Sequence, residues 1–267
     1  MPTDPRPLVV VSGPIHPDGL ALLEREARVV VTEDPSEEAM MRTAAEADGI
    51  LFRIRPRCTA ALMEACPRLR VVGRHGVGLD TVDIPAATRL GIAVVHAPGS
   101  NSQAVAEHAL MLMLACVKHT LEVDRMTRAG DWSRRRNSVN TELGGKTLGI
   151  VGLGRVGAMV AQRALAFGMR VIAYDPYVPR ERAREMGVDL MPSLEALLVQ
   201  SDFVSLHLPR TPQTEGLIGA HELSLMKEGA RLVNTARGGI VDEEALAKAI
   251  ADGHLGGAAL DVFAQEP

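Results

Sequence analysis

One stretch of this sequence limits its possible folds more than any other: an apolar run, residues 146–151, that leads into three closely spaced glycines. The glycines are Gly152, Gly154 and Gly157, and Asp175 follows Gly152 by 23 positions, directly after a second apolar run. In a strand–turn–helix unit the first glycine allows the tight turn, the second lets the backbone approach a pyrophosphate, and the third lets the helix pack on the sheet. The spacing therefore predicts a βαβ dinucleotide site.

The residues around the glycines indicate which dinucleotide. The N–H groups of Arg155 and Val156 begin the predicted helix, where the positive end of the helix dipole favours phosphates. Asp175 can accept hydrogen bonds from a ribose 2′-hydroxyl and repels a 2′-phosphate, so it favours NAD over NADP. A purely structural glycine turn is the alternative. The helical pattern from Ala158 to Phe167 and the helix stop at Gly168 agree with the cofactor interpretation.

Short β-branched runs alternate with helical patterns along the chain, which predicts an α/β fold with two doubly wound parallel sheets. A single long helix from Ser102 to Ala129 is expected to bridge a first domain, residues 1–100, and a second, residues 101–267. Glycines expected to end helices are Gly91, Gly168, Gly187 and Gly253. The strands are predicted at residues 8–12, 29–32, 50–52, 71–73, 92–95, 148–151, 170–174, 188–190, 203–206, 232–234 and 258–260.

Composition excludes several classes of function. A net charge of −4 and a pI of about 6.1 predict no nucleic-acid partner. The longest apolar run, Ala109–Val117, is shorter than the roughly 20 residues that span a bilayer, so no membrane partner is expected. Cys58, Cys66 and Cys116 form no CxxC pair, which favours reduced thiols in a cytoplasmic protein. No residue cluster has metal-ligand spacing, and no metal is expected.

Four segments in order carry a resemblance to a known family: residues 73–80, GRHGVGLD; the turn at 152–157; residues 233–239, VNTARGG; and residues 261–267, DVFAQEP. Together they resemble the D-isomer-specific 2-hydroxyacid dehydrogenases. The resemblance implies NAD-dependent hydride transfer to or from a small D-2-hydroxy or 2-keto acid of the 3-phosphoglycerate, hydroxypyruvate or glyoxylate type. It also implies a flavodoxin-like substrate domain, a Rossmann domain and a homodimer.

The same resemblance implies roles for individual residues. Arg237 matches the arginine that holds the substrate carboxylate and polarises the carbonyl, and Glu266 matches the acid that orients the catalytic histidine. A planar guanidinium suits a carboxylate because it forms two parallel hydrogen bonds. A surface arginine and a solvated glutamate are the alternatives. Further substrate-binding residues are Arg53, Gly76, Val77 and Gly78. Further cofactor-binding residues are Val105, His207, Pro209, Thr214, Thr235, Ala236 and Asp261, together with Arg237 itself.

The sequence departs from the family pattern at one important position. The family's proton donor is a histidine in a Pro-His pair some tens of residues beyond the position of Glu266, whereas this sequence ends at Pro267. We therefore expect either a truncated version of a longer product, lacking also the segment that returns to the first domain, or a natural remnant. The alternative function is an NAD-binding regulatory or catalytically impaired protein, since general acid catalysis is worth about 10² to 10⁴-fold.

Two first-domain residues bear on substrate and acid/base chemistry. His75 adjoins the Gly76–Gly78 loop and is a candidate substitute acid, although a polar residue packed against the loop is the favoured interpretation. Ile54 stands where the family usually has a small hydroxyl residue, which puts phosphoglycerate specificity in doubt.

Overall fold

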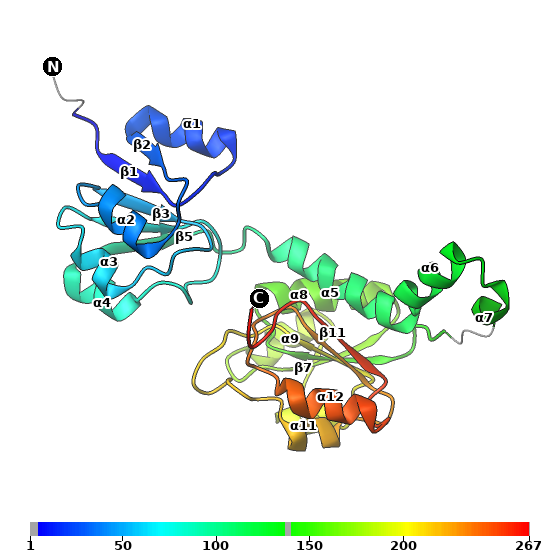
Figure 1. Cartoon of the computed structure of the whole chain (residues 1–267). Coiled ribbons are helices and arrows are strands. Elements are labelled where there is room, and N and C mark those ends of the chain that lie inside the picture. Colours follow the sequence, from blue (N-terminus) through cyan, green and yellow to red (C-terminus); the bar gives the residue numbers. More distant parts are fainter. Residues whose placement is uncertain (1–4, 137–139, 267) are drawn as a thin grey trace. The chain divides into compact units, whose positions relative to one another are not determined.

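The computed structural model describes residues 5–136 and 140–266, and the chain divides into two compact units, Met1–Asn101 and Ser102–Pro267 (Figure 1). Each unit has its own parallel sheet, with no strand shared between them among the described residues. The predicted α/β class with two doubly wound parallel sheets is confirmed.

The first unit has a five-stranded sheet in the order β2-β1-β3-β4-β5, the flavodoxin-like order. Its strands are β1 (Leu8–Val11), β2 (Arg28–Val31), β3 (Gly49–Phe52), β4 (Val71–Arg74) and β5 (Ala93–His96). Its helices are α1 (Pro17–Glu26), α2 (Glu37–Thr43), α3 (Ala60–Glu64) and α4 (Ile84–Leu90). The chain order reverses between β1 and β3, so residues that follow these two strands face the position where such sheets bind ligands.

Local sequence explains where these helices begin. Ser36, Thr59 and Asp83 each precede a helix, and each side chain accepts a hydrogen bond from a backbone N–H of the first turn. The core of this unit lies where α2, α3 and α4 pack on one face of the sheet, around Met40, Leu62 and other fully buried residues. Helix α1 contributes no fully buried residue.

The second unit has a six-stranded sheet in the order β11-β10-β9-β6-β7-β8, which is the Rossmann order. The strands are β6 (Thr147–Val151), β7 (Arg170–Tyr174), β8 (Asp189–Leu190), β9 (Phe203–Leu206), β10 (Arg231–Asn234) and β11 (Gly257–Leu260). All pairs are parallel. The short strand predicted at residues 188–190 exists as β8 and pairs with β7. The order reverses between β6 and β9.

Two apolar layers cover this sheet. On one face α5 (Ser102–Val117) and α8 (Arg155–Ala166) pack against each other, with α9 (Arg180–Glu185) beside them. On the other face lie α10 (Leu194–Leu198), α11 (Ala220–Leu225) and α12 (Glu243–Ala251). The strands alternate between the two layers: Phe203 belongs to the first core and Val204 to the second.

The prediction of one long helix from Ser102 to Ala129 is wrong. Helix α5 ends at Val117, α6 (Thr120–Arg128) begins after Lys118 and His119, and the two helices are bent by 61° relative to each other. The break lies at His119, which adopts a left-handed backbone conformation with φ of 48° and so cannot continue a right-handed helix. The polar stretch that follows contains a short helix, α7 (Trp132–Arg136).

Two further features of the backbone bear on the sequence predictions. Gly91, Gly168, Gly187 and Gly253 all have positive φ, as expected of residues that end helices.

No single described helix is long and apolar enough to cross a membrane, although the bent pair α5 and α6 passes that test together on length and composition alone. Within α5, Ala109, Met113 and Val117 are fully buried in the core of the second unit.

Candidate functional site

Five of the predicted cofactor residues lie at one edge of the second sheet because each directly follows a parallel strand. The carboxyl ends of parallel strands lie at the same edge, and in doubly wound sheets ligands bind there, beside the point where strand order reverses. The residues that follow β6, β7, β9, β10 and β11 are Gly152, Asp175, His207, Thr235 and Asp261. All five were candidates from the sequence.

The three glycines of the turn meet three different surroundings. Gly152 has φ of 93°, and a Cβ there would lie 2.5 Å from the carbonyl oxygen of His207. A Cβ on Gly157 would collide with the carbonyl oxygen of Gly152, so only glycine lets α8 approach β6 this closely. A Cβ on Gly154 would meet no protein atom within 4 Å. Gly154 therefore faces open space, as a residue beside a bound pyrophosphate requires.

Helix α8 starts at this turn without a side-chain cap. Gly154 is the N-cap residue, and its carbonyl accepts the hydrogen bond of Ala158 N–H. The N–H groups of Arg155 and Val156 belong to the first turn, where an α-helix supplies no intrahelical acceptor. This helix end therefore suits an anion such as a phosphate.

Asp175 is built into the turn as well as placed beside it. One carboxylate oxygen, Oδ2, accepts from Leu153 N–H at 2.8 Å, and the other, Oδ1, accepts from Tyr177 N–H at 2.9 Å. Each carboxylate oxygen has a second lone pair for a ligand hydroxyl. The contact with Leu153 was not foreseen from the sequence, because the glycine spacing says nothing about that N–H.

The segment after β9 contains His207, Pro209 and Thr214. Nε2 of His207 lies 2.8 Å from Oγ of Ser205, and burial lowers the pKa of His207 to about 4. The ring is therefore neutral near pH 7. The hydroxyl of Thr214 donates to the Pro209 carbonyl at 2.7 Å, which closes the loop on itself. Ser205 was not a candidate from the sequence.

The segment after β10 is held by Asn234, a residue also missed. Asn234 Oδ1 accepts from Ala236 N–H at 3.0 Å, and its Nδ2 donates to the Arg237 carbonyl at 2.9 Å. The guanidinium of Arg237 donates to the Ala236 carbonyl at 2.7 Å. Thr235 is buried, and its hydroxyl is sealed from solvent without a hydrogen-bond partner among the described residues. An asparagine ending an apolar run before Thr-Ala-Arg-Gly was the available signal.

The Arg237 loop lies directly against the turn that carries Glu266. A Cβ on Gly238 would collide with the backbone of Phe263 and Ala264, so the two segments touch at that glycine. Glu266 is exposed, and its Oε1 accepts from Phe263 N–H at 2.9 Å. Glu243, at the start of α12, accepts from Ala264 N–H at 2.6 Å and secures the turn.

Two more candidates lie on this side of the sheet. Asp261 donates its backbone N–H to the Asn234 carbonyl, and its carboxylate lies 3.4 Å from Nε2 of His108. Val105 is partly buried on α5, the helix that packs against β10 and β11. In the described residues no group of three or more His, Cys, Asp or Glu side chains could hold a metal ion.

The substrate candidates of the first unit follow β3 and β4. Arg53 N–H donates to Ser12 Oγ at 3.0 Å, which joins the ends of β1 and β3 where strand order reverses. Its Nε is sealed from solvent and has no hydrogen-bond partner in the part of the chain that the structure describes.

The Gly76–Gly78 loop is anchored by the end of β5. Gly76 has φ of 151°, and its carbonyl accepts from Ala97 N–H at 3.0 Å. The Val77 carbonyl lies 2.8 Å from Nδ1 of His96, an anchoring residue that the sequence analysis did not identify. His75, which was expected to pack against this loop, is an exposed residue.

Known proteins share the sequence and architecture of this chain. Residues 110–267 match the model of a protein family described as D-isomer specific 2-hydroxyacid dehydrogenase, NAD binding domain. D-3-phosphoglycerate dehydrogenase of Mycobacterium bovis is 46% identical over 261 residues, which are 98% of this chain and 49% of that protein. The chain thus spans about half the length of the curated relatives it matches.

Solved structures show the same similarity. A glyoxylate reductase from Paecilomyes thermophila superposes with a TM-score of 0.89 at 30% identity, covering 99% of this chain and 84% of that one. D-lactate dehydrogenase from Aquifex aeolicus, complexed with NAD and lactic acid, gives a TM-score of 0.84 at 32% identity, covering 96% and 77%.

Proposed function

This chain belongs to the D-isomer-specific 2-hydroxyacid dehydrogenase family, and from that membership we propose that it transfers a hydride between NAD and a small D-2-hydroxy or 2-keto acid. The observation that carries the proposal is the shared edge of the second sheet. The glycine turn with Asp175 and the Arg237 loop against the Glu266 turn both follow strands of that sheet.

We propose that residues 101–267 form the dinucleotide-binding domain. NAD is the cofactor of this family domain, and it carries the hydride at its nicotinamide ring. Gly152, Gly154 and Gly157 with the first turn of α8 suit the pyrophosphate, and Asp175 suits the ribose hydroxyls. The remaining proposed cofactor contacts are Val105, Arg155, Val156, His207, Pro209, Thr214, Thr235, Ala236, Arg237 and Asp261.

For the substrate, we propose that Arg237 binds the carboxylate and polarises the adjacent carbonyl. A guanidinium stays charged at any physiological pH and binds a carboxylate through two parallel hydrogen bonds. In residues 1–100, the proposed substrate domain, we propose that Arg53 and the loop Gly76, Val77 and Gly78 also contact the substrate. The proposed substrate class is that of 3-phosphoglycerate, hydroxypyruvate or glyoxylate, since relatives are named for phosphoglycerate and glyoxylate.

We propose that Glu266 orients the acid/base histidine expected from the family. A carboxylate beside an imidazole fixes its tautomer and stabilises its protonated form. The hydrogen bonds from Phe263 to Glu266 and from Ala264 to Glu243 give this turn a defined backbone, which a positioning carboxylate requires.

The test is NADH oxidation by the full gene product with hydroxypyruvate, glyoxylate and 3-phosphohydroxypyruvate. Arg237→Ala should lower kcat/KM by about 100-fold or more, because it removes a charge-assisted pair, while NADH still binds. Arg170→Ala removes an exposed arginine at the opposite edge of the sheet and serves as the control. Unchanged turnover in Arg237→Ala would reject the assignment. NADH binding by the parent protein with no turnover of any acid would favour the regulatory alternative.

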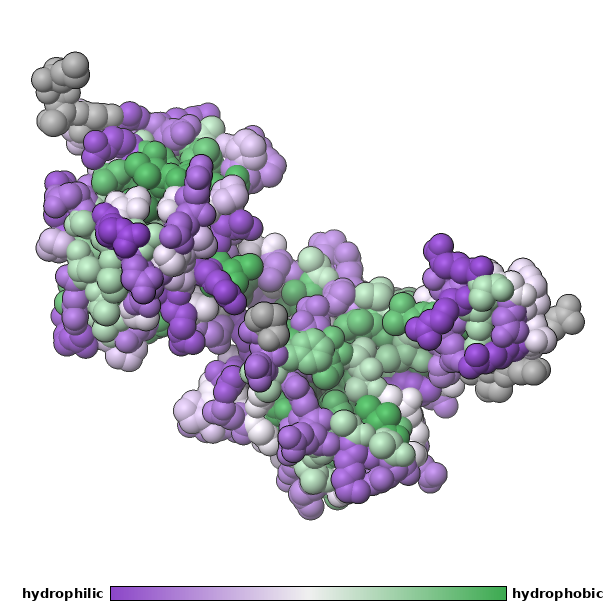
Figure 2. All heavy atoms as spheres, viewed as in Figure 1, coloured by the Kyte–Doolittle hydropathy of each residue, from purple (hydrophilic) through white to green (hydrophobic). Residues whose placement is uncertain are grey.

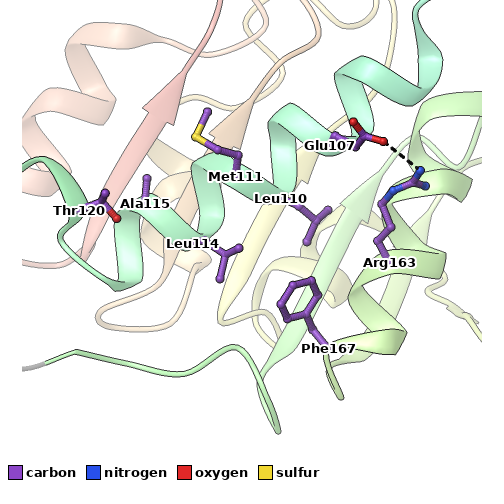
Figure 3. A pocket seen from close by; sticks show the side chains of 8 residues that line it. All are labelled: Glu107, Leu110, Met111, Leu114, Ala115, Thr120, Arg163 and Phe167. Atoms are coloured by element: carbon purple, nitrogen blue, oxygen red, sulfur yellow. Dashed lines mark ion pairs between the residues drawn. The ribbon is translucent and has the colours of Figure 1, made fainter.

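We also propose a homodimer formed through the second unit. A groove of about 420 Å³ runs between α5 and α8, where Leu110, Leu114 and Phe167 point toward the space between the helices (Figure 3). Glu107 and Arg163 form an ion pair of 3.7 Å at its rim. Hydrophobic residues gather over α5 on the visible face of this unit (Figure 2). A second copy would bury Met111 and Phe167, each 47% exposed.

We propose a cytoplasmic location for the protein, since Cys58, Cys66 and Cys116 are all free thiols. Fractionation of cells that express a tagged full gene product would test it, and recovery outside the cytoplasm would reject it.

A further inference from the structure

We propose that Ser205 is a positioning residue of the cofactor site: its hydroxyl donates to Nε2 of His207, so that the neutral ring carries its proton on Nδ1 and offers that N–H to an acceptor oxygen of the bound dinucleotide. The proposal rests on the proposed NAD site. It assigns a function to a buried serine and one tautomer to a histidine.

The surroundings of Ser205 leave its hydroxyl a single partner. Ser205 lies on β9 between Ile150 of β6 and Val233 of β10, which are its neighbours in the parallel registers. Both neighbours belong to the apolar core under α5 and α8, and Ser205 is 0% exposed. Among the described residues, its one hydrogen-bond partner is Nε2 of His207, at 2.8 Å.

The available hydrogen-bond donors and acceptors determine the tautomer of His207. If Nε2 carried the ring proton, it would donate to Ser205, and the serine hydrogen would have no acceptor inside an apolar core. Leaving a buried donor unsatisfied costs about 1 to 3 kcal/mol. If Ser205 donates instead, the hydroxyl and Nε2 are both satisfied. Burial lowers the pKa of His207 to about 4, so the Nε2 lone pair is available near pH 7.

The proton on Nδ1 then needs a partner that the described residues do not supply. No hydrogen bond to Nδ1 is formed within the described residues, and Nδ1 is absent from their sealed, unpartnered polar atoms. A ligand can therefore reach it. His207 also adjoins the glycine turn: its N–H donates to the Val151 carbonyl, and its carbonyl oxygen blocks a Cβ on Gly152. Ribose and phosphate oxygens are the acceptors that a dinucleotide brings to such a turn.

The experiment is ¹⁵N NMR of the histidine rings in the unliganded protein, with the His207 signal assigned from its loss in His207→Gln. We expect the pattern of the Nδ1-protonated tautomer in the parent protein. Ser205→Ala should move His207 toward the Nε2-protonated tautomer and raise the Kd for NADH by about 3- to 10-fold, the effect of one neutral hydrogen bond. Ser205→Thr, which keeps the hydroxyl, should restore both readouts.

Ser201→Ala is the matched control, because Ser201 is also 0% exposed and donates its hydroxyl to the Leu197 carbonyl. It should leave the His207 tautomer and the NADH affinity unchanged. An Nε2-protonated His207 in the parent, or an unchanged tautomer in Ser205→Ala, would overturn the proposal. The first measurement needs no variant at Ser205, so misfolding of Ser205→Ala leaves the proposal falsifiable. Failure of the parent to bind NADH would reject the NAD site while the tautomer is still read independently.

Discussion

Single residues at the carboxyl edge of the second sheet belong both to the fold and to the proposed cofactor site. Asp175 shows this most directly, because its carboxylate accepts from Leu153 N–H inside the glycine turn and also follows β7, where a ribose hydroxyl is expected. We expect its negative charge, and not its shape, to discriminate against a 2′-phosphate. Charge and shape can be separated by one conservative substitution.

Asp175→Asn should narrow the preference for NADH over NADPH by about 10-fold, because it removes the charge but keeps an oxygen that can accept from Leu153. The measurement is the Kd of both cofactors by fluorescence titration. Asp189→Asn, an exposed carboxylate of β8 paired with Arg170, is the control. Equal NADH and NADPH affinity in the parent would contradict the carboxylate argument.

The lowered pKa of His207 predicts that the free energy of unfolding depends on pH. Its folded pKa of about 4 lies below the ordinary value of 6.5, so between these values the unfolded chain binds a proton that the folded chain does not. Stability is therefore full above pH 6.5 and decreases as the pH falls toward about 4, by up to about 3 kcal/mol.

Urea unfolding across that pH window, followed by circular dichroism, measures the effect. His207→Gln should lose this part of the slope, whereas His75→Gln, at an exposed position, should keep it. A His207→Gln protein with the same slope as the parent would show that other groups account for the acid sensitivity.

Elements set distances that no single residue determines, and the β6–turn–α8 unit is the clearest case. Gly157 sits where α8 touches the carbonyl of Gly152, whereas Gly154 faces open space. Gly157 therefore allows a helix to pack on a strand, and we propose that Gly154 allows a ligand to approach the backbone.

Gly157→Ala should destabilise the second unit by about 1 to 3 kcal/mol, because its methyl group would overlap a backbone carbonyl. Gly154→Ala should leave the Tm nearly unchanged, since its methyl meets no protein atom, and should raise the Kd for NADH by about 10-fold or more. Thermal melts and NADH titrations of both variants measure the contrast. Normal NADH binding by Gly154→Ala would place the pyrophosphate elsewhere.

At the scale of the whole molecule, the second unit carries an apolar groove as well as the proposed cofactor site. Beyond the groove between α5 and α8, the helices that follow α5 expose further hydrophobic residues, including Leu121 at 78% and Trp132 at 54% exposed. Helices α6 and α7 extend beyond the sheet of their unit (Figure 1). These features support a second copy as the partner of this surface.

Met111→Glu should convert the proposed dimer to a monomer, because it places a charge in the apolar groove. Val199→Glu is the control, since Val199 is 49% exposed and ends α10 on the other face of the sheet. Sedimentation velocity measures both. A parent protein that sediments as a monomer would reject the dimer.

The sequence by itself determined the elements whose signals are local. Apolar β-branched runs predict strands because alternate side chains must be buried, and the glycine spacing predicts the turn because only glycine tolerates its conformation and close packing. The parallel α/β class and the residues that follow β6, β7, β9, β10 and β11 were therefore predictable. The family resemblance suggested the roles of Arg237 and Glu266. From their chemistry alone, both could equally have been solvated surface residues.

Only the tertiary structure decided what depends on contacts between distant segments. The helix break at His119 was not predictable from periodicity, because apolar residues continue beyond it and the left-handed residue is a histidine. The hydrogen bond from Leu153 to Asp175 and the contact of Gly238 with Phe263 join distant segments, and each involves backbone groups that every residue carries. Such groups leave no mark in a sequence, and folding alone determines which of them meet.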